Sequence, residues 1–397
     1  MRIAQITIST PYKENLRGTS GIQYHLLVQR PKDVEVTTYS FNANKLTPEQ
    51  IKEVERELNI TIKVVKIPRW LEWFMTHPLL IIRVFLKYPF TAYYKLSKEV
   101  VKEIRSAKYD GIWLYGLELF RILRDFPDVP RVHTLPDSEA LYYYRMLGQR
   151  FVFTKRMTLW RQFVMYPKFL RLEHDLLTDK NVHYTLVGEA DKAFLMNNNP
   201  KIQAHFLRHP HYEIAQPQKM NNFSQPKIRL LLAGQYNLYM QQAADEWVEE
   251  MCKVTDLQSH YIITMLGKGW ERSVEKLQQV GYVVNLITYA PNYIEEICKH
   301  DIQFTPICIG TGTKGKVLDA LANGLLVIGT EYAMENIEVK NGESCIIYNK
   351  SDDAIAALRD IAANPRKYEE MAEKGRRAVL MHHSRKHVAQ LFFDLFK

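Results

Sequence analysis

The sequence predicts an α/β protein that consists of two doubly wound, Rossmann-like domains. Short apolar runs alternate with amphipathic segments along the whole chain, a pattern typical of parallel sheets covered by helices on both faces. The 397 residues suffice for two domains of ordinary size. The alternation is interrupted by a stretch rich in Gln, Asn and Pro at 213–226, which is typical of a linker.

Each strand of the first domain is predicted from an apolar run rich in β-branched and aromatic residues. These runs are Ile3–Ile8, Val34–Tyr39, Ile60–Ile67, Gly111–Tyr115, Arg131–Leu135 and Val182–Leu186. Apolar residues at helical spacing predict helices between them, for example at Pro48–Leu58 and Ala92–Arg105.

The second domain repeats the pattern. Its predicted strands are Ile228–Leu232, Tyr261–Met265, Val283–Leu286, Ile302–Thr305, Leu325–Ile328 and Cys345–Tyr348. Its predicted helices are Gln241–Met251, Val274–Val280, Asn292–Cys298, Lys316–Leu321, Asp352–Ala362 and Lys367–Leu380.

These elements predict an N-terminal domain at 1–212, the linker at 213–226, a C-terminal domain at 227–383 and a last helix at 384–397 that packs back on the N-terminal domain. Ligands of doubly wound sheets lie at the carboxyl ends of the strands. Two such domains that face each other therefore predict a ligand cleft between them.

Composition favours a cytoplasmic protein. The N-terminus reads as a strand and not as a secretory signal, and no run approaches the roughly 20 apolar residues of a membrane span. The four cysteines are scattered without metal-site spacing, which indicates reduced core thiols. Residues 1–210 contain 32 of the 53 Lys and Arg and 21 of the 44 Asp and Glu, so their net charge is +11. The remaining residues carry −2, which gives the net charge of +9. The asymmetry suggests that the first half meets an anionic surface.

A glycine loop carries the strongest chemical signal. Residues 305–330 read TPICIGTGTKGKVLDALANGLLVIGT, so a strand is followed by Gly310, Gly312 and Gly315 and then by a helix that starts near Lys314. Main-chain N–H groups and the helix dipole make such a start an anion site, and the lysines suit a diphosphate. Asp319, one turn later, is placed to accept hydrogen bonds from ribose hydroxyls. The alternative is a plain glycine turn with solvated lysines.

The run GTGTKGKVLDALANGLLVIGT resembles the donor-site signature of glycosyltransferase family 4, whose fold is called GT-B. The resemblance extends through the second half, from Lys227–Gly234 to the Lys374-Gly375-Arg376 region. It implies that the carboxylate at the Asp319 position binds the ribose of a nucleotide sugar and that the loop and helix start hold its diphosphate. The donor site implied in this way comprises Gly234, Gln235, Lys268, Gly310, Thr311, Gly312, Thr313, Lys314, Lys316, Val317 and Asp319.

The chain departs from the family pattern at several positions. The family usually has glutamate at the Asp319 position, and often a second glutamate where this chain has Thr311. The arginine and lysine that the family often places after the first glycine of the second domain are missing after Gly234, and Lys268 or Lys316 is the predicted substitute.

The first half resembles the family more weakly. Gly18, Thr19, Ser20 and Gly21 precede a helix and predict a loop for the donor phosphate or the acceptor, with a helix cap as the alternative.

His133, after a strand, and Asp137 are the candidate catalytic residues, because a strand-end His-x-x-x-Asp suits the orientation of an acceptor hydroxyl. The alternative is that Asp137 or Ser138 caps the following helix. Glu189 matches a family position near the cleft or caps a helix, and His209 and His211 are interpreted as structural.

Residues 140–172 combine seven basic with nine aromatic residues and no acidic one. A similar patch comprises Trp70, Trp73, Phe74, Arg83, Phe85, Lys87, Tyr88 and Phe90. Aromatic and basic helices suit an anionic membrane surface, so peripheral contact with the inner membrane face is a hypothesis beside the alternative of core aromatics and solvated cations.

Together these features predict a glycosyltransferase that moves a sugar from a UDP- or GDP-sugar to a hydroxyl of a glycan or lipid-linked acceptor in cell-surface polysaccharide or glycoconjugate synthesis. No DxD-like carboxylate pair is present, so no metal is expected. The resemblance implies a retaining reaction. The alternatives are a nucleotide-sugar epimerase on the same fold and a non-catalytic nucleotide-binding protein. Nucleic-acid binding is not expected, since the basic first half contains no recognised motif for it.

Overall fold

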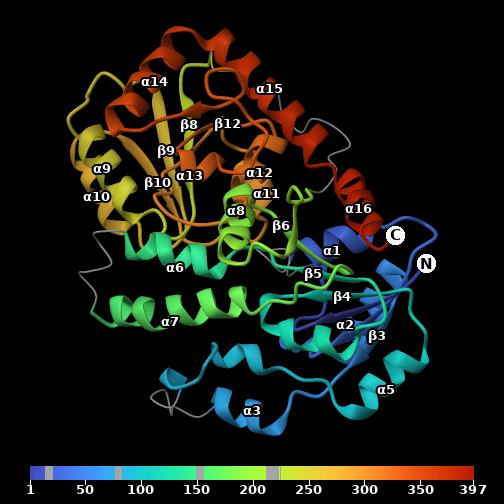
Figure 1. Cartoon of the computed structure of the whole chain (residues 1–397). Helices are drawn as coiled ribbons and strands as arrows, with labels where there is room; N and C mark the ends of the chain where they lie inside the picture. The colour runs from blue at the N-terminus through green and yellow to red at the C-terminus, as the bar shows by residue number, and fades with distance from the viewer. Residues whose placement is uncertain (14–20, 77–82, 149–155, 212–222, 224) are drawn as a thin grey trace. The chain divides into compact units, whose positions relative to one another are not determined.

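The computed structural model describes residues 1–13, 21–76, 83–148, 156–211, 223 and 225–397, with only the backbone at 75 and 156–160. The chain divides into two compact units, Met1–Pro210 with Arg385–Lys397, and His211–Ser384. Each unit holds one sheet whose described strand pairs are all parallel, with helices on both faces (Figure 1). This confirms the predicted α/β fold class with two doubly wound, Rossmann-like sheets. The predicted linker lies largely outside the described residues.

The first sheet has the order β3-β2-β1-β4-β5-β6-β7. Its strands are β1 (Arg2–Thr7), β2 (Glu35–Ser40), β3 (Thr61–Val64), β4 (Gly111–Tyr115), β5 (Arg131–Thr134), β6 (Val182–Leu186) and β7 (Gln203–Phe206). The described helices of this unit are α1 (Gly21–Val28), α2 (Pro48–Leu58), α3 (Arg69–Thr76), η3 (Phe90–Tyr93), α5 (Lys98–Ser106), η4 (Leu117–Asp125), α6 (Glu139–Leu147), α7 (Arg156–His174), α8 (Glu189–Asn198) and α16 (Arg385–Asp394).

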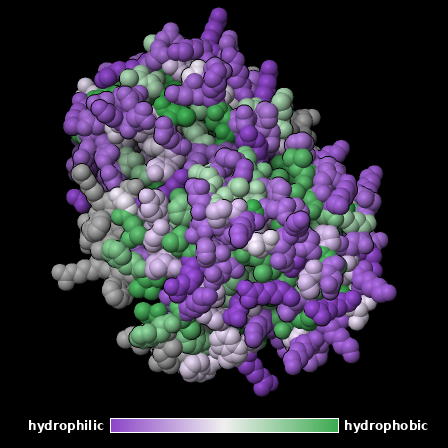
Figure 2. Space-filling model, in the orientation of Figure 1, coloured by the Kyte–Doolittle hydropathy of each residue, from purple (hydrophilic) through white to green (hydrophobic). Residues whose placement is uncertain are grey.

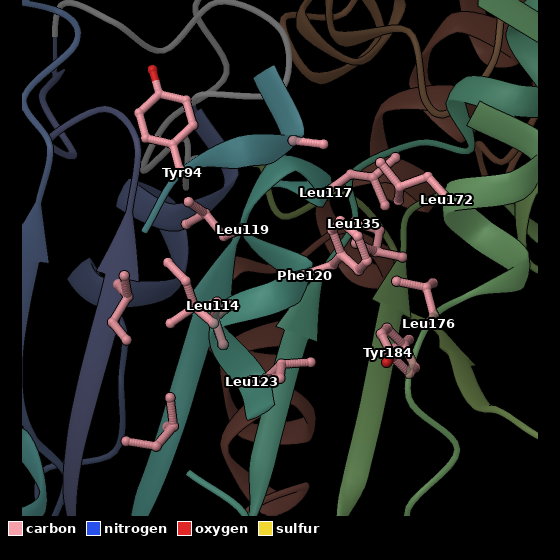
Figure 3. Close-up of a cluster of buried hydrophobic side chains, with 14 of the residues drawn as sticks. Tyr94, Leu114, Leu117, Leu119, Phe120, Leu123, Leu135, Leu172, Leu176 and Tyr184 are labelled. Atoms are coloured by element: carbon pink, nitrogen blue, oxygen red, sulfur yellow. The ribbon is translucent and has the colours of Figure 1, made fainter. Parts of the chain in front are cut away.

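Side chains alternate between the two faces of this sheet, as the pleat requires. Ala4 and Ile6 of β1 join a core with η4, α6 and α7, whereas Ile3 joins a second core with α1, α2 and α16. Figure 3 shows part of the first core, to which Leu114 of β4, Tyr184 of β6 and Leu172 of α7 contribute. The two apolar faces explain why the strands read as near-continuous apolar runs.

The second sheet has the order β10-β9-β8-β11-β12-β13. Its strands are β8 (Ile228–Ala233), β9 (Tyr261–Leu266), β10 (Val283–Ile287), β11 (Ile302–Thr305), β12 (Leu326–Gly329) and β13 (Ile346–Ile347). Its described helices are α9 (Gln241–Met251), α10 (Glu271–Gln279), α11 (Tyr293–Ile297), α12 (Gly315–Ala322), α13 (Glu331–Met334), α14 (Ser351–Ala363) and α15 (Pro365–His382). One core contains α9, α10 and α14, and the other contains α12 and α13.

Local sequence fixes the helix ends. Thr47 caps α2 through a capping box with Gln50, Pro48 occupies the first turn, and Asn59 ends the helix in the left-handed conformation. Among the described residues, no helix is long and apolar enough to cross a membrane.

Candidate functional site

Two glycine turns meet at the carboxyl ends of β8 and β9. Gly234 and Gly267 have φ of 149° and 141°, a region that side chains disfavour. A β-carbon on Gly267 would stand 2.1 Å from the carbonyl oxygen of Gly234. The same oxygen accepts a 2.7 Å hydrogen bond from Nε1 of the buried Trp270. The backbones therefore approach closely at the edge where doubly wound sheets bind ligands.

The loop after β11 is held by its own lysine. Gly310 and Gly312 have φ of 149° and 61°. The Lys314 ammonium donates 3.0 Å hydrogen bonds to the carbonyls of Thr311 and Gly312 and lies 3.5 Å from a Glu335 carboxylate oxygen. Lys314 thus stabilises the loop shape that the glycines allow.

The loop leads into α12, which starts at Gly315 after the N-cap Lys314. A lysine side chain has no acceptor atom for the N–H groups of the first turn. The helix dipole and these groups favour an anion at this end. Thr311 and Thr313 are half-buried in the loop that precedes it.

Lys316 brings a positive charge to the Gly234 turn. Its side chain is exposed, and its Nζ lies 3.5 Å from the point where a β-carbon on Gly234 would stand. The Nζ also lies 5.7 Å from the ring centroid of Tyr293. Gln235 and Lys268 are exposed on the neighbouring turns, where the Lys268 carbonyl accepts a hydrogen bond from the Tyr236 N–H. Of the two lysines that the sequence offers as substitutes, Lys316 brings its Nζ to the Gly234 turn.

Asp319 stands one turn into α12 and is already oriented. Its Oδ1 lies 3.0 Å from Nε2 of His211, and its side chain keeps 23% of its exposure. The main-chain N–H of His211 donates a 2.8 Å hydrogen bond to the carbonyl of His383. His211 and Ser384 also form an isolated parallel β-bridge, so main-chain contacts hold the histidine in place. The interpretation of His211 as structural missed this contact, because no spacing in the sequence links positions 211 and 319.

Val317 does not offer its side chain to a ligand. The side chain is fully buried in the core beneath α12, and its N–H bonds to the Lys314 carbonyl. The assignment of Val317 to the donor site stays a prediction, and the side chain itself belongs to the core.

In the first unit, Gly21 is the first residue of α1, whereas Gly18, Thr19 and Ser20 lie outside the described residues. His133 lies within β5 and not beyond its end, and it is fully buried. Its Nε2 lies 2.8 Å from the Gly116 carbonyl, and burial lowers the pKa of the ring to about 4, so the ring is neutral. This placement corrects the expectation of a histidine that touches an acceptor, since the ring belongs to the core.

Asp137 lines a cavity of about 200 Å³ at the carboxyl ends of β1, β4 and β5, together with Ser9, Gln23, Tyr115, Glu118 and Glu139. The following helix, α6, is capped by the Ser138 hydroxyl and not by Asp137. Sequence analysis named Asp137 as a candidate and did not name Glu118 and Glu139, which line the same cavity. The available signal was that Glu118 follows the predicted strand Gly111–Tyr115 and Glu139 follows Arg131–Leu135.

Two further acidic residues accept main-chain hydrogen bonds at the start of α6. An Asp191 carboxylate oxygen accepts a 2.8 Å hydrogen bond from the Ser138 N–H, and Glu173 accepts one of 3.0 Å from the Ala140 N–H. Burial raises the pKa of Glu173 to about 8. Glu189, at the start of α8, has a mostly exposed side chain that pairs with Lys192.

Comparisons with known proteins agree with this architecture. Residues 242–394 match the model of a family described as glycosyl transferase-like. No curated protein matches the chain. HepE of Anabaena in complex with UDP is similar over 99% of both chains, with a TM-score of 0.62 and 10% identity.

Two other solved structures are similar over nearly their whole length. Sucrose-phosphate synthase of Thermosynechococcus elongatus shares 13% identity with a TM-score of 0.62, over 100% of this chain and 98% of that one. The lipopolysaccharide outer core galactosyltransferase WaaB shares 10% identity with a TM-score of 0.60, over 100% and 99%. The two sheets and the full-length similarity to these structures give the chain the GT-B fold, and residues 242–394 match a glycosyl transferase-like family model. Most of the matched segment lies in the second unit, and its last residues, 385–394, belong to the first.

Proposed function

We propose that the chain transfers a sugar from a nucleoside-diphosphate sugar to a hydroxyl of a glycan or lipid-linked acceptor. One observation carries the proposal: Lys316, at the start of α12, reaches the Gly234 turn. Negative charge grows on the diphosphate as its bond to the sugar breaks. Oriented N–H groups, a helix dipole and an ammonium group that are already in place stabilise this charge. Because they supply positive charge, we expect the reaction to proceed without a divalent metal ion.

The ribose of the donor is assigned to Asp319, whose second carboxylate oxygen is left for hydroxyl groups once His211 holds the first. The similar HepE structure contains UDP, so a UDP-sugar is the first donor to test. Retention of configuration and a role in surface polysaccharide or glycoconjugate synthesis are proposed from the resemblance to family 4.

A thermal-shift screen with UDP, GDP, ADP, CMP and their common sugars tests the donor site. A ligand at 100 times its Kd stabilises the folded state by about 2.7 kcal/mol. We expect a shift with one nucleotide, which Asp319→Ala removes. The control Glu275→Ala, which removes an exposed carboxylate of α10, keeps the shift.

Chemistry is tested with the nucleotide sugar selected by that screen. Release of nucleotide that depends on an added acceptor supports transfer. Conversion of the donor sugar without acceptor would instead identify an epimerase, and binding with no turnover of any acceptor would identify a non-catalytic protein. No shift with any nucleotide contradicts the proposed donor site.

The acceptor is proposed to be reached at an anionic membrane surface on the cytoplasmic side. Trp70 and Trp73 of α3 are 50% and 47% exposed, and Phe85 is 84% exposed. Arg69 and Lys87 are exposed beside them. Figure 2 shows hydrophobic side chains among polar ones on the lower left of the visible face. Exposed aromatic rings beside cations suit the interface of an anionic bilayer.

A further inference from the structure

The cavity lined by Asp137 in the first unit lies where a ligand of this fold is expected. In the sheet, β1 lies between β2 and β4, so the strand order reverses its direction at β1. The cavity opens next to this point, at the carboxyl ends of β1, β4 and β5. Such a switch point is where open α/β sheets bind ligands. Its volume of about 200 Å³ is below the 300–1,000 Å³ of pockets that enclose drug-sized molecules, so it suits a single small ring.

The polar lining of this cavity is one-sided in charge. Glu118, Asp137 and Glu139 contribute carboxyl groups, and Ser9, Gln23 and Tyr115 contribute hydroxyl and amide groups. Among the described residues that line it, none is lysine, arginine or histidine. Elsewhere around α6 the buried acids are used by the fold, since Asp191 and Glu173 accept main-chain hydrogen bonds. The Glu118 carboxyl accepts a hydrogen bond from its own main-chain N–H. No main-chain hydrogen bond to the Glu139 carboxyl is found within the described part of the chain.

The surroundings raise the pKa of both Glu118 and Glu139. Burial raises the pKa of Glu118. The pKa of Glu139 is raised to about 7, mainly by burial and also by the negative charges of Glu118 and Asp191, while the positive charge of Arg161 lowers it. A carboxylic acid donates a hydrogen bond and a carboxylate accepts several, so either form binds sugar hydroxyls. An anionic group would instead meet like charge in a partly desolvated site, where repulsion is strong.

We propose that this cavity receives an uncharged, hydroxyl-rich ring of the acceptor, and that Glu118 and Glu139 exclude rings that carry a carboxylate, phosphate or sulfate. The inference rests on the proposed function, because it names the acceptor class of that reaction. Glu118 and Glu139 are specificity-determining residues here.

The test compares matched neutral and anionic rings on the full chain. Methyl glucoside against methyl glucuronide, and methyl galactoside against methyl galacturonide, differ only at the sixth carbon. Saturation-transfer NMR with saturating nucleotide measures binding of each probe to the wild type, Glu118→Gln, Glu139→Gln, the double variant, and the control Glu35→Gln, which removes an exposed carboxylate at the start of β2. Glutamine keeps the shape and removes a charge that burial disfavours, so the variants are expected to fold.

We expect the wild type and the control to bind a neutral ring at least tenfold more tightly than its anionic partner. The double variant should narrow that ratio tenfold or more. Equal affinity for both rings, preference for the anionic ring, no binding of either ring, or an unchanged ratio in the double variant each overturns the inference. A nucleotide-induced thermal shift is measured in parallel, so failure of the donor site is recorded separately from failure of this cavity.

Discussion

The Asp319 carboxylate is held in place by one contact. Its Oδ1 lies 3.0 Å from Nε2 of the nearly buried His211. A held carboxylate loses less conformational entropy when a ligand binds, so its hydrogen bonds contribute more to affinity.

Replacing His211 is predicted to act through the ribose. His211→Leu should weaken nucleotide binding about tenfold, because a hydrogen bond to a charged group contributes about 1.5–3 kcal/mol and only part of it is lost. His211→Gln retains a donor at similar reach and should restore most of the affinity. Isothermal titration with the nucleotide and its 2′,3′-dideoxy analogue checks this.

The histidine effect should vanish with the dideoxy analogue if His211 acts on Asp319 and Asp319 acts on the ribose. The exposed His260 provides the control His260→Leu, which is expected to bind as the wild type does. An equal loss for both ligands would show that His211 supports the fold alone.

At the scale of elements, the predicted strands follow from their apolar runs. Each of the twelve runs overlaps one of β1–β6 and β8–β13. The seventh strand, Gln203–Phe206, was missed because all four of its residues are half-buried at the sheet edge, so no apolar run marks it. The helix α7 carries Pro167 in its interior, which breaks the sequence pattern of a helix.

The direction of side chains was less predictable than the elements. The glycine loop, its lysines and Asp319 could be grouped from the sequence because they follow one another along a single segment. The burial of His133 and Val317, and the meeting of Glu118 with Glu139, depend on how separate elements pack. Spacing along one segment carries no information about such contacts.

The start of α6 is predicted to make stability depend on pH. Burial raises the pKa of Glu173 from 4.5 to about 8. Between these values the folded chain holds a proton that the unfolded chain releases, so the free energy of unfolding falls as pH rises through this window. Glu173→Gln should flatten this decline by up to roughly 1 kcal/mol per pH unit.

Urea unfolding between pH 5 and pH 8 measures that slope. Glutamine still accepts from the Ala140 N–H, so the helix start remains capped. Glu72→Gln, on the exposed side of α3, serves as control and should leave the slope unchanged. A steeper decline in Glu173→Gln than in the wild type would contradict the assigned direction.

The last helix completes the core of the first unit. Phe392 of α16 is fully buried, and its ring lies 4.7 Å from that of Trp113 in β4, centroid to centroid. Phe392→Ala is predicted to lower the free energy of unfolding of this unit by about 3–5 kcal/mol, because it leaves a cavity. The neighbouring Leu391 is 44% exposed, so Leu391→Ala should change it by about 0.5 kcal/mol or less.

Calorimetry measures the loss, and it resolves the two units if they unfold separately. Equal effects of the two substitutions would show that α16 contributes through the helix as a whole and not through the Phe392 ring.

At the scale of the whole molecule, charge and exposed aromatic residues coincide in sequence. Residues 1–210 carry 32 Lys and Arg against 21 Asp and Glu, and the same part of the chain contains Trp70, Trp73 and Phe85 on its surface. Scattered single aromatics are ordinary on protein surfaces, but three within one short stretch beside cations favour a binding surface.

Vesicle binding distinguishes a membrane surface from a solvated one. We expect the chain to co-sediment with phosphatidylcholine vesicles that contain phosphatidylglycerol at low salt, and to be released at high salt, because each cation near an anionic bilayer contributes about 1 kcal/mol and salt screens it. Trp70→Ala combined with Phe85→Ala should reduce vesicle binding several-fold, because the rings no longer insert into the bilayer.

Tyr289 is 68% exposed in the second unit, so Tyr289→Ala is the matched control and should bind vesicles as the wild type does. Salt-sensitive binding that the aromatic variant retains in full would mean that cations alone make the contact, and absence of binding at low salt would remove the membrane from the proposed function while leaving the donor site untouched.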